Sequence, residues 1–253
     1  MTPSLELLSE LEKELHESAS AASRWERSAF LGQVKENHSR GGALLSDAHR
    51  EGAGGLELCA ARSAFIDALL GQVWSHALCA WEEETRRPEA LPPCAMLAIG
   101  GYGRGELSPG SDIDLLFLFP KRSAEGSRLV RTALYLLWDA GLNIGHSART
   151  LPECMRIARE DFQSETAMLE FRLVAGEEEV AAEFSRRLQG HLRRSGKSSH
   201  LKRRLRERSE RYSSWDPSVY VQEPNIKESA GGLRDLHMVL WLARVFGAEG
   251  LEG

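Results

Sequence analysis

The first third of the chain carries apolar residues at helical spacing. Thr2-Pro3 is a helix-start pattern, because proline suits the first helical position. The leucines that follow at this spacing are Leu5, Leu8, Leu11 and Leu15. A second helix is predicted from Leu56 to Arg86, where the apolar residues fall mainly on one face: Leu58, Phe65, Leu69, Val73, Ala77 and Trp81. Between these patterns, the five glycines of Gly41–Gly55 predict a loop.

The middle of the chain alternates between strand and helix patterns. Cys94–Ile99 and Asp112–Phe119 predict two short strands, Leu129–Ala140 predicts a helix, and Leu142–Thr150 predicts a third strand. From Pro152 onward the pattern is helical, and no further strand is predicted. This order predicts an α+β fold, with a small sheet between N-terminal and C-terminal helical regions.

The stretch Ala98–Phe119 reads A-I-G-G-Y-G-R-G-E-L-S-P-G-S-D-I-D-L-L-F-L-F and joins two chemical signals. Its glycines allow backbone N–H groups to approach phosphate oxygens closely. Asp112 and Asp114 open a predicted strand, in which alternate residues face the same side. Two carboxylates that converge in this way repel each other and favour a bound divalent cation. The stretch therefore predicts a metal-dependent site for a nucleoside triphosphate.

Two familiar phosphate-binding motifs do not fit this glycine turn. No Gly-Lys-Ser/Thr follows it, which excludes a P-loop, and Gly101, Gly103 and Gly105 lead into a strand instead of opening a helix. Phosphoryl or nucleotidyl transfer remains, with Arg104 supplying charge to the phosphates and Ser111 a hydrogen bond. The alternative is structural: a tight turn before an amphipathic strand. Five glycines in eleven residues beside these charged groups favour the functional interpretation.

Composition narrows the class of protein. The chain of 253 residues is 42% apolar and 27% charged, and its net charge of −5 argues against a general nucleic-acid or membrane binder. The four cysteines are widely spaced, with no C-x-x-C pair and no metal-finger spacing, and neither a signal peptide nor an apolar run of membrane-spanning length is visible. A cytoplasmic protein is expected.

The segment Arg186–Arg211 has a charge opposite to that of the whole chain. It contains eleven Lys or Arg and two Glu, an excess of +9. Either it is the solvated face of a helix, or it is a surface that attracts triphosphate or an acidic partner. Few aromatic residues interleave with these charges, which argues against RNA binding.

Three separated segments together resemble the PII-protein uridylyltransferases, of the DNA polymerase β-like nucleotidyltransferase superfamily. They are the glycine-and-aspartate stretch, L-W-D-A-G-L-N-I-G-H-S-A-R-T at Leu137–Thr150, and E-P-N-I-K-E-S-A-G-G-L-R-D-L-H at Glu223–His237. The resemblance covers roughly Ala95 to Ala243 and concerns the N-terminal part of such proteins only. It implies a polymerase β-like nucleotidyltransferase core.

The resemblance also implies an activity and its residues. The family transfers UMP from UTP to a tyrosine hydroxyl of a PII nitrogen-signalling protein, with Mg²⁺. Carried over to this chain, Asp112 and Asp114 are the catalytic residues and metal ligands. The residues expected to bind the nucleotide are Gly100, Gly101, Arg104, Ser111, Lys227, Arg234 and Asp235. For the last three, a helix cap with surface charges is an equally weighted interpretation.

A third carboxylate is often present in this superfamily, and the sequence does not place one. The predicted strand Asn143–Thr150 has no acid and offers His146, either a core histidine or a participant. Glu170 is another candidate, although a charge on a helix near Arg172 is the favoured interpretation.

The resemblance leaves two alternatives and one departure. An adenylyltransferase related to the glutamine synthetase-modifying enzymes shares the layout, and a module that binds nucleotide without turnover is a second alternative. Family members continue into a phosphohydrolase domain and glutamine-sensing domains, whereas this sequence has no His-Asp dipeptide. We therefore expect neither removal of UMP nor glutamine sensing in this chain, which is either a fragment or a short relative.

The expected domain boundaries are 1–55 (helical region and loop), 56–175 (nucleotidyltransferase domain) and 176–253 (helical domain).

Overall fold

The computed structural model describes residues 2–22, 24, 26–86, 93–214, 223 and 225–247. The chain divides into two compact units, Met1–Phe184 and Ser185–Gly253. The domain boundaries predicted at residues 55 and 175 stay a prediction.

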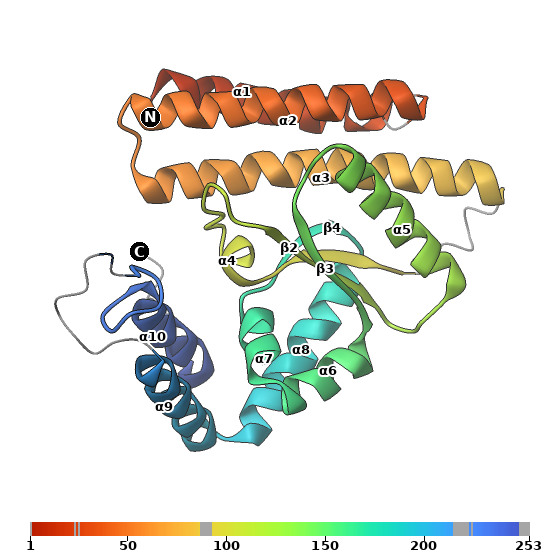
Figure 1. The fold of residues 1–253 in the computed structure, drawn as a ribbon. Helices are drawn as coiled ribbons and strands as arrows, with labels where there is room; N and C mark the ends of the chain where they lie inside the picture. Colours follow the sequence, from red (N-terminus) through yellow and green to blue (C-terminus); the bar gives the residue numbers. More distant parts are fainter. Residues whose placement is uncertain are drawn as a thin grey trace. The chain divides into compact units, whose positions relative to one another are not determined.

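Three long helices lie side by side in the first unit: α1 (Pro3–Ala22), α2 (Arg27–Arg50) and α3 (Gly55–Thr85) (Figure 1). The helix predicted to start at Thr2-Pro3 is confirmed, and its four leucines are buried. The predicted apolar face of α3 is also buried along its whole length. The sequence pattern therefore identified the buried faces of α1 and α3, but it did not predict α2.

The loop predicted for Gly41–Gly55 is wrong. Helix α2 continues to Arg50, and the chain turns only after it. Gly41 lies against α3, where an added Cβ would be 2.3 Å from Cζ of the Phe65 ring. Glycine at this position allows α2 and α3 to pack closely, because the Phe65 ring occupies the space that any side chain would need.

The four-stranded sheet has the order β3-β2-β1-β4. Strand β1 (Ala95–Ala98) pairs antiparallel with β2 (Ile113–Phe119) and with β4 (Arg172–Gly176), whereas β2 and β3 (Ile144–Thr150) are parallel. This small mixed sheet, flanked by helices, is the α+β architecture that the sequence predicts. The three predicted strands are confirmed within two residues at each end.

The prediction that strands stop before Pro152 is wrong, because β4 adds an edge strand to β1. Its five residues are separated from the short helix α7 (Phe162–Leu169) only by Glu170 and Phe171. An apolar run of this length has too few residues for its period to separate a strand from a buried helix. Pairing with β1 decides the outcome.

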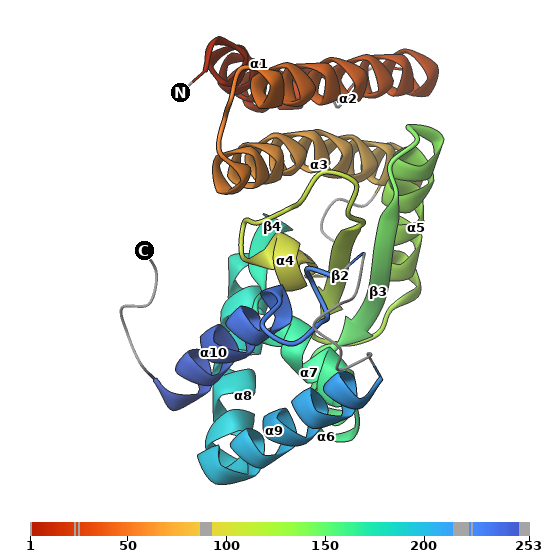
Figure 2. The same ribbon diagram turned by 60° about the vertical axis from the view of Figure 1, so that its left-hand side comes forward.

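Helices cover both faces of the sheet. The parallel pair β2 and β3 requires a crossover, which α5 (Ala124–Asp139) supplies. Figures 1 and 2 show α3 and α5 on one side of the sheet, and α6 (Leu151–Glu160) and α7 on the other. Helix α5 begins five residues before the predicted start at Leu129, because Ser123 caps it: its Oγ accepts a hydrogen bond from the N–H of Gly126 at 2.9 Å.

The second unit is helical, as predicted. Helix α8 (Glu178–Ser195) leads into it, and α9 (Lys197–Ser213) packs against α10 (Leu233–Phe246). Part of the basic segment belongs to this packing, since the buried guanidinium of Arg204 lies 4.5 Å from the ring centre of Trp241.

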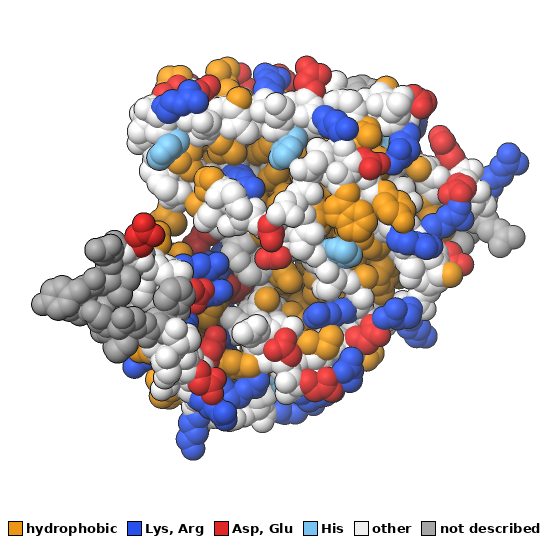
Figure 3. Space-filling view, in the orientation of Figure 1, with side chains coloured by type: hydrophobic (Ala, Val, Ile, Leu, Met, Phe, Trp, Pro, Cys, Tyr) orange, Lys and Arg blue, Asp and Glu red, His pale blue; other side chains and the backbone are white. Residues whose placement is uncertain are grey.

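The surface mixes both signs of charge, and Figure 3 shows Asp and Glu interspersed with Lys and Arg over the face in view. Among the described residues, no helix combines the length and apolar character that crossing a membrane requires.

Candidate functional site

Asp112 and Asp114 lie at the start of β2, as predicted. Asp112 immediately precedes the strand, Asp114 is its second residue, and both side chains are exposed, whereas the rest of β2 is buried. Side chains two residues apart on a strand face the same side, with their Cα atoms roughly 7 Å apart. The two acids therefore stand at one accessible end of an otherwise apolar strand.

The glycine turn lies directly beside these aspartates. Strands β1 and β2 are antiparallel, and the N–H of Ile99 donates to the backbone oxygen of Asp114 at 3.1 Å. The turn continues as one short helical segment, α4 (Gly100–Gly103), which the sequence did not predict. Gly100 has a φ of +62°, a left-handed conformation that glycine adopts without steric cost. Sheet pairing thus brings Gly100 and Gly101 next to the carboxylates.

Helix α3 anchors the loop between the turn and Asp112. The guanidinium of Arg62 donates to the backbone oxygens of Ser108 and Ser111, the latter at 3.2 Å. Ser63 Oγ accepts a hydrogen bond from the N–H of Leu107 at 3.0 Å. Ser111 itself is exposed next to Asp112, and its hydrogen bond to phosphate stays a prediction.

The same helix also holds α4. The hydroxyl of Tyr102 donates to Asp67 at 2.5 Å, and Asp67 pairs with Arg172 of β4. Burial, and then the adjacent Asp67 carboxylate, raises the pKa of Tyr102 well above its ordinary value, so the hydroxyl keeps the proton that it donates. Sequence reasoning missed Arg62, Ser63 and Asp67, since polar residues on a helix do not show what they face.

Arg104 is held inside the molecule. Its Nε lies 2.9 Å from Glu106 Oε2, and its Nη1 pairs with Glu170. Its side chain is only 9% exposed and that of Glu170 1%. The geometry shows Arg104 as a support beneath the turn, while its contact with phosphate stays a prediction.

The favoured interpretation of Glu170, a charge on a helix near Arg172, is wrong. Glu170 follows the last residue of α7 and is buried against the glycine turn. An added Cβ on Gly103 would lie 1.5 Å from the Glu170 backbone oxygen, so α4 and the end of α7 touch through a bare backbone. Glu170 therefore contacts the turn in two ways: its carboxylate pairs with Arg104, and its backbone oxygen packs against Gly103.

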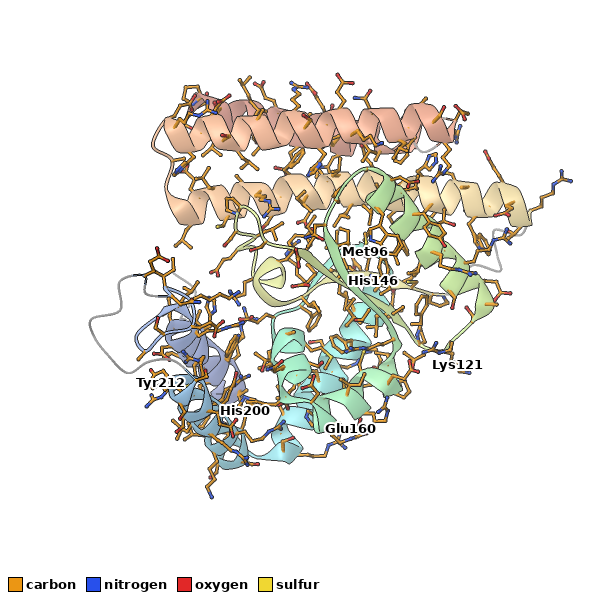
Figure 4. All side chains as sticks on the ribbon, in the orientation of Figure 1. Met96, Lys121, His146, Glu160, His200 and Tyr212 are labelled. Atoms are coloured by element: carbon orange, nitrogen blue, oxygen red, sulfur yellow. The ribbon has the colours of Figure 1, made fainter. Side chains whose placement is uncertain are left out.

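His146 does not join the aspartates. It is opposite Leu115 in the β2–β3 register, whereas Asp114 is opposite Gly145, so strand alternation directs His146 to the other face. Its ring lies 5.5 Å from that of Trp138 on α5, and Figure 4 shows it projecting from β3. On the face of Asp114, strand β3 carries Gly145, Ser147 and Arg149.

The donor set suits a hard cation. Within the described residues, no group of three or more His, Cys, Asp or Glu could hold a metal ion. Two exposed carboxylates nevertheless fit Mg²⁺, which keeps several water ligands and binds through one or two carboxylates together with substrate phosphates.

The other three predicted residues lie in the second unit. Asp235, in the first turn of α10, accepts hydrogen bonds from Arg211 Nη2 at 2.5 Å, from the Gly231 N–H at 2.7 Å and from the Tyr212 hydroxyl. Burial alone would raise the pKa of Asp235, but these hydrogen bonds together hold it below its ordinary value. Asp235 is thus a structural clamp within this unit.

Arg234 and Lys227 differ in their surroundings. Arg234 Nε lies 3.2 Å from Glu228 Oε1, and Lys227 is exposed. Helix α10 begins directly after Gly232. Their contact with nucleotide stays a prediction.

Comparison with known proteins agrees with this architecture. Residues 86–174 match the model of the nucleotidyltransferase domain, and residues 199–252 match that of the GlnD PII-uridylyltransferase family. The first match contains β1, β2, β3 and both aspartates and ends within β4, and the second contains the Glu223–His237 segment.

Individual relatives extend the match along most of the chain. A bifunctional uridylyltransferase/uridylyl-removing enzyme of Phenylobacterium zucineum is 36% identical over 220 residues, which are 87% of this chain and 23% of the relative. A protein of the same description from Caulobacter vibrioides strain NA1000 is 35% identical over 219 residues, or 86% of this chain and 23% of the relative. The chain thus spans about a quarter of their length, and it carries the nucleotidyltransferase domain of the PII-uridylyltransferase family.

Proposed function

We propose that this chain transfers UMP from UTP to a tyrosine hydroxyl of a PII-type nitrogen-regulatory protein. One observation carries the proposal: two exposed carboxylates at the start of β2 lie beside a glycine turn that two helices hold in place. The relatives are named bifunctional uridylyltransferase/uridylyl-removing enzymes, which supports UTP as the donor, and the matching family model is that of a PII-uridylyltransferase, which supports a PII protein as the acceptor.

In this proposal Asp112 and Asp114 hold Mg²⁺ against the triphosphate. When bound, Mg²⁺ neutralises phosphate charge and favours the deprotonated form of an attacking hydroxyl, whose pKa as a free tyrosine is about 10. Gly100 and Gly101 offer backbone N–H groups to the phosphates, and Ser111 offers its hydroxyl.

The surroundings of the turn supply rigidity. Donors that are already oriented before the reaction stabilise developing charge without further reorganisation. Hydrogen bonds from Arg62 and Tyr102, together with the buried Arg104–Glu170 pair, give the turn this preorganisation.

The second unit takes a separate part in the proposal. Lys227, Arg234 and Asp235 are its nucleotide-binding residues, and the hydrogen bonds of Asp235 also keep their segment folded. The nucleotidyltransferase domain is assigned to 56–175, and a cytoplasmic location stays a prediction.

The test is label transfer from α-labelled UTP or ATP to a purified PII protein in the presence of Mg²⁺. We expect transfer from UTP, with a loss of at least 100-fold in both Asp112→Asn and Asp114→Asn. The matched control is Asp47→Asn, which removes a half-exposed carboxylate from α2 and should leave the rate unchanged.

Each contrary outcome points to a different conclusion. Transfer from ATP alone would favour the adenylyltransferase alternative, and metal-dependent nucleotide binding without release of pyrophosphate would favour the binding module. Transfer that survives both aspartate substitutions would refute the site.

A further inference from the structure

Strand β3 runs parallel to β2 and brings its first residues beside the two aspartates. The register pairs Ile113 with Ile144 and Asp114 with Gly145. The N–H of Ile113 donates to the backbone oxygen of Asn143 at 3.0 Å, which extends this alignment to Asp112. Each aspartate therefore has its own neighbour across the strands: Asn143 for Asp112, and Gly145 for Asp114.

Asn143 contacts Asp112 directly, since its side-chain Nδ2 donates to Asp112 Oδ1. A neutral amide orients a carboxylate without cancelling its charge. A lysine or arginine at this position would compete with a cation for the same oxygens. The amide thus leaves Asp112 available as an anionic ligand.

Gly145 acts by having no side chain. An added Cβ would lie 2.4 Å from Asp114 Oδ1, closer than real Cβ atoms come to a neighbour, and 3.5 Å from Cγ. The backbone of Gly145 lacks the left-handed φ found at nine other glycines of the described residues, so conformation does not require glycine here. The carboxylate of Asp114 occupies the space that a side chain would need.

We propose that Asn143 and Gly145 are positioning residues that set the orientation of the two metal ligands. Asn143 fixes Asp112 by a hydrogen bond, and Gly145 lets Asp114 lean across β3. This inference rests on the proposed function of the same site. It predicts that a methyl group at residue 145 displaces the Asp114 carboxylate and weakens metal-dependent nucleotide binding.

A purely structural role for Gly145 predicts something different. Alanine is intrinsically favoured over glycine inside a strand, and the atom that the new methyl group would meet is the end of the exposed Asp114 side chain. Gly145→Ala should therefore keep or raise the melting temperature while metal binding weakens. Tight packing alone would lower the melting temperature and the binding together.

The experiment measures retention of labelled UTP or ATP by the whole chain as Mn²⁺ is titrated, with no acceptor protein present. Whichever nucleotide the wild type retains is used for the variants. We expect the Mn²⁺ concentration at half-maximal retention to rise at least tenfold in Gly145→Ala, with no fall in melting temperature. Asn143→Ala should raise it by a smaller factor, at least threefold.

The control is Gly42→Ala, which adds a methyl group where nothing lies within 4 Å and should leave the titration unchanged. Wild-type titration midpoints in both β3 variants would overturn the inference and leave the proposed function standing. A fall in melting temperature that accounts for the loss in Gly145→Ala, together with normal binding in Asn143→Ala, would also overturn it. Failure of the wild type to retain either nucleotide with Mn²⁺ would remove the proposed function and the inference together.

Discussion

The carboxylate of Glu170 pairs with the guanidinium of Arg104, and the two side chains are 1% and 9% exposed. They are 66 residues apart in sequence, and together they join the end of α7 to the glycine turn. Burying an ion pair brings little net stability, but removing one partner leaves an uncompensated charge away from water.

Glu170→Gln should therefore lower the free energy of unfolding by about 3 kcal/mol, because Arg104 would lose its most buried partner. Urea denaturation at pH 7 measures this difference. The matched control is Glu106→Gln, which removes the more exposed carboxylate that pairs with the same guanidinium and should cost less than about 1 kcal/mol. Equal effects of the two substitutions would contradict the assignment of Glu170 as the main anchor.

Two neighbouring glycines of α2 allow a second comparison. Gly41→Ala should destabilise the protein by about 1–3 kcal/mol, because the new methyl group would overlap the Phe65 ring. Gly42→Ala adds the same group in open space and should stabilise the helix by about 0.5–1 kcal/mol. Thermal unfolding of both variants measures the difference. If both substitutions proved stabilising, Gly41 would not be a packing glycine.

The start of α6 should contribute to the free energy of unfolding in a pH-dependent way. Glu153 accepts a hydrogen bond from the N–H of Thr150 at 2.7 Å and pairs with Arg122 at 2.8 Å. The Thr150 hydrogen bond first, and then Arg122, lowers the pKa of Glu153 from 4.5 to about 2. A lowered folded-state pKa means that the stabilisation is present above pH 4.5 and is lost as the pH falls towards 2.

Glu153→Gln should thus cost about 1 kcal/mol at pH 7, a typical value for a helix cap, and progressively less below pH 4.5. Denaturant titrations of wild type and variant between pH 7 and pH 3 give the difference. A gap that stays constant across this range would show that the charge of Glu153 is not what stabilises the cap.

Asp235 separates a structural role from a nucleotide-binding role. Asp235→Asn should weaken the hydrogen bonds to Arg211 and Tyr212 and destabilise the second unit by about 1–3 kcal/mol. Hydrogen exchange of the α10 amides measures this loss. Lys227→Ala changes an exposed side chain and should leave the exchange unaltered. An unchanged exchange pattern in Asp235→Asn, with weakened nucleotide binding, would instead favour direct contact.

Local pattern was enough for much of the architecture. Helical spacing identified the buried faces of α1 and α3, since a helix must bury its apolar stripe wherever it packs. Alternation along β2 placed Asp112 and Asp114 at one end of a buried strand, and the glycines before them indicated a turn. These features depend only on residues close together in the chain.

Other features depend on what lies across from a residue. In the sequence Gly41 is typical of a loop, and only the structure shows the Phe65 ring against it. Strand β4 is too short to recognise from its sequence alone and is defined by its pairing with β1. The partner of Glu170, Arg104, is likewise known only from the fold. The amino-acid sequence by itself determined helices α1 and α3, the three main strands and the acidic strand end, but not helix α2. Tertiary structure alone decided which side chains support that end, because contacts between distant segments follow from packing and leave no periodic trace in the chain.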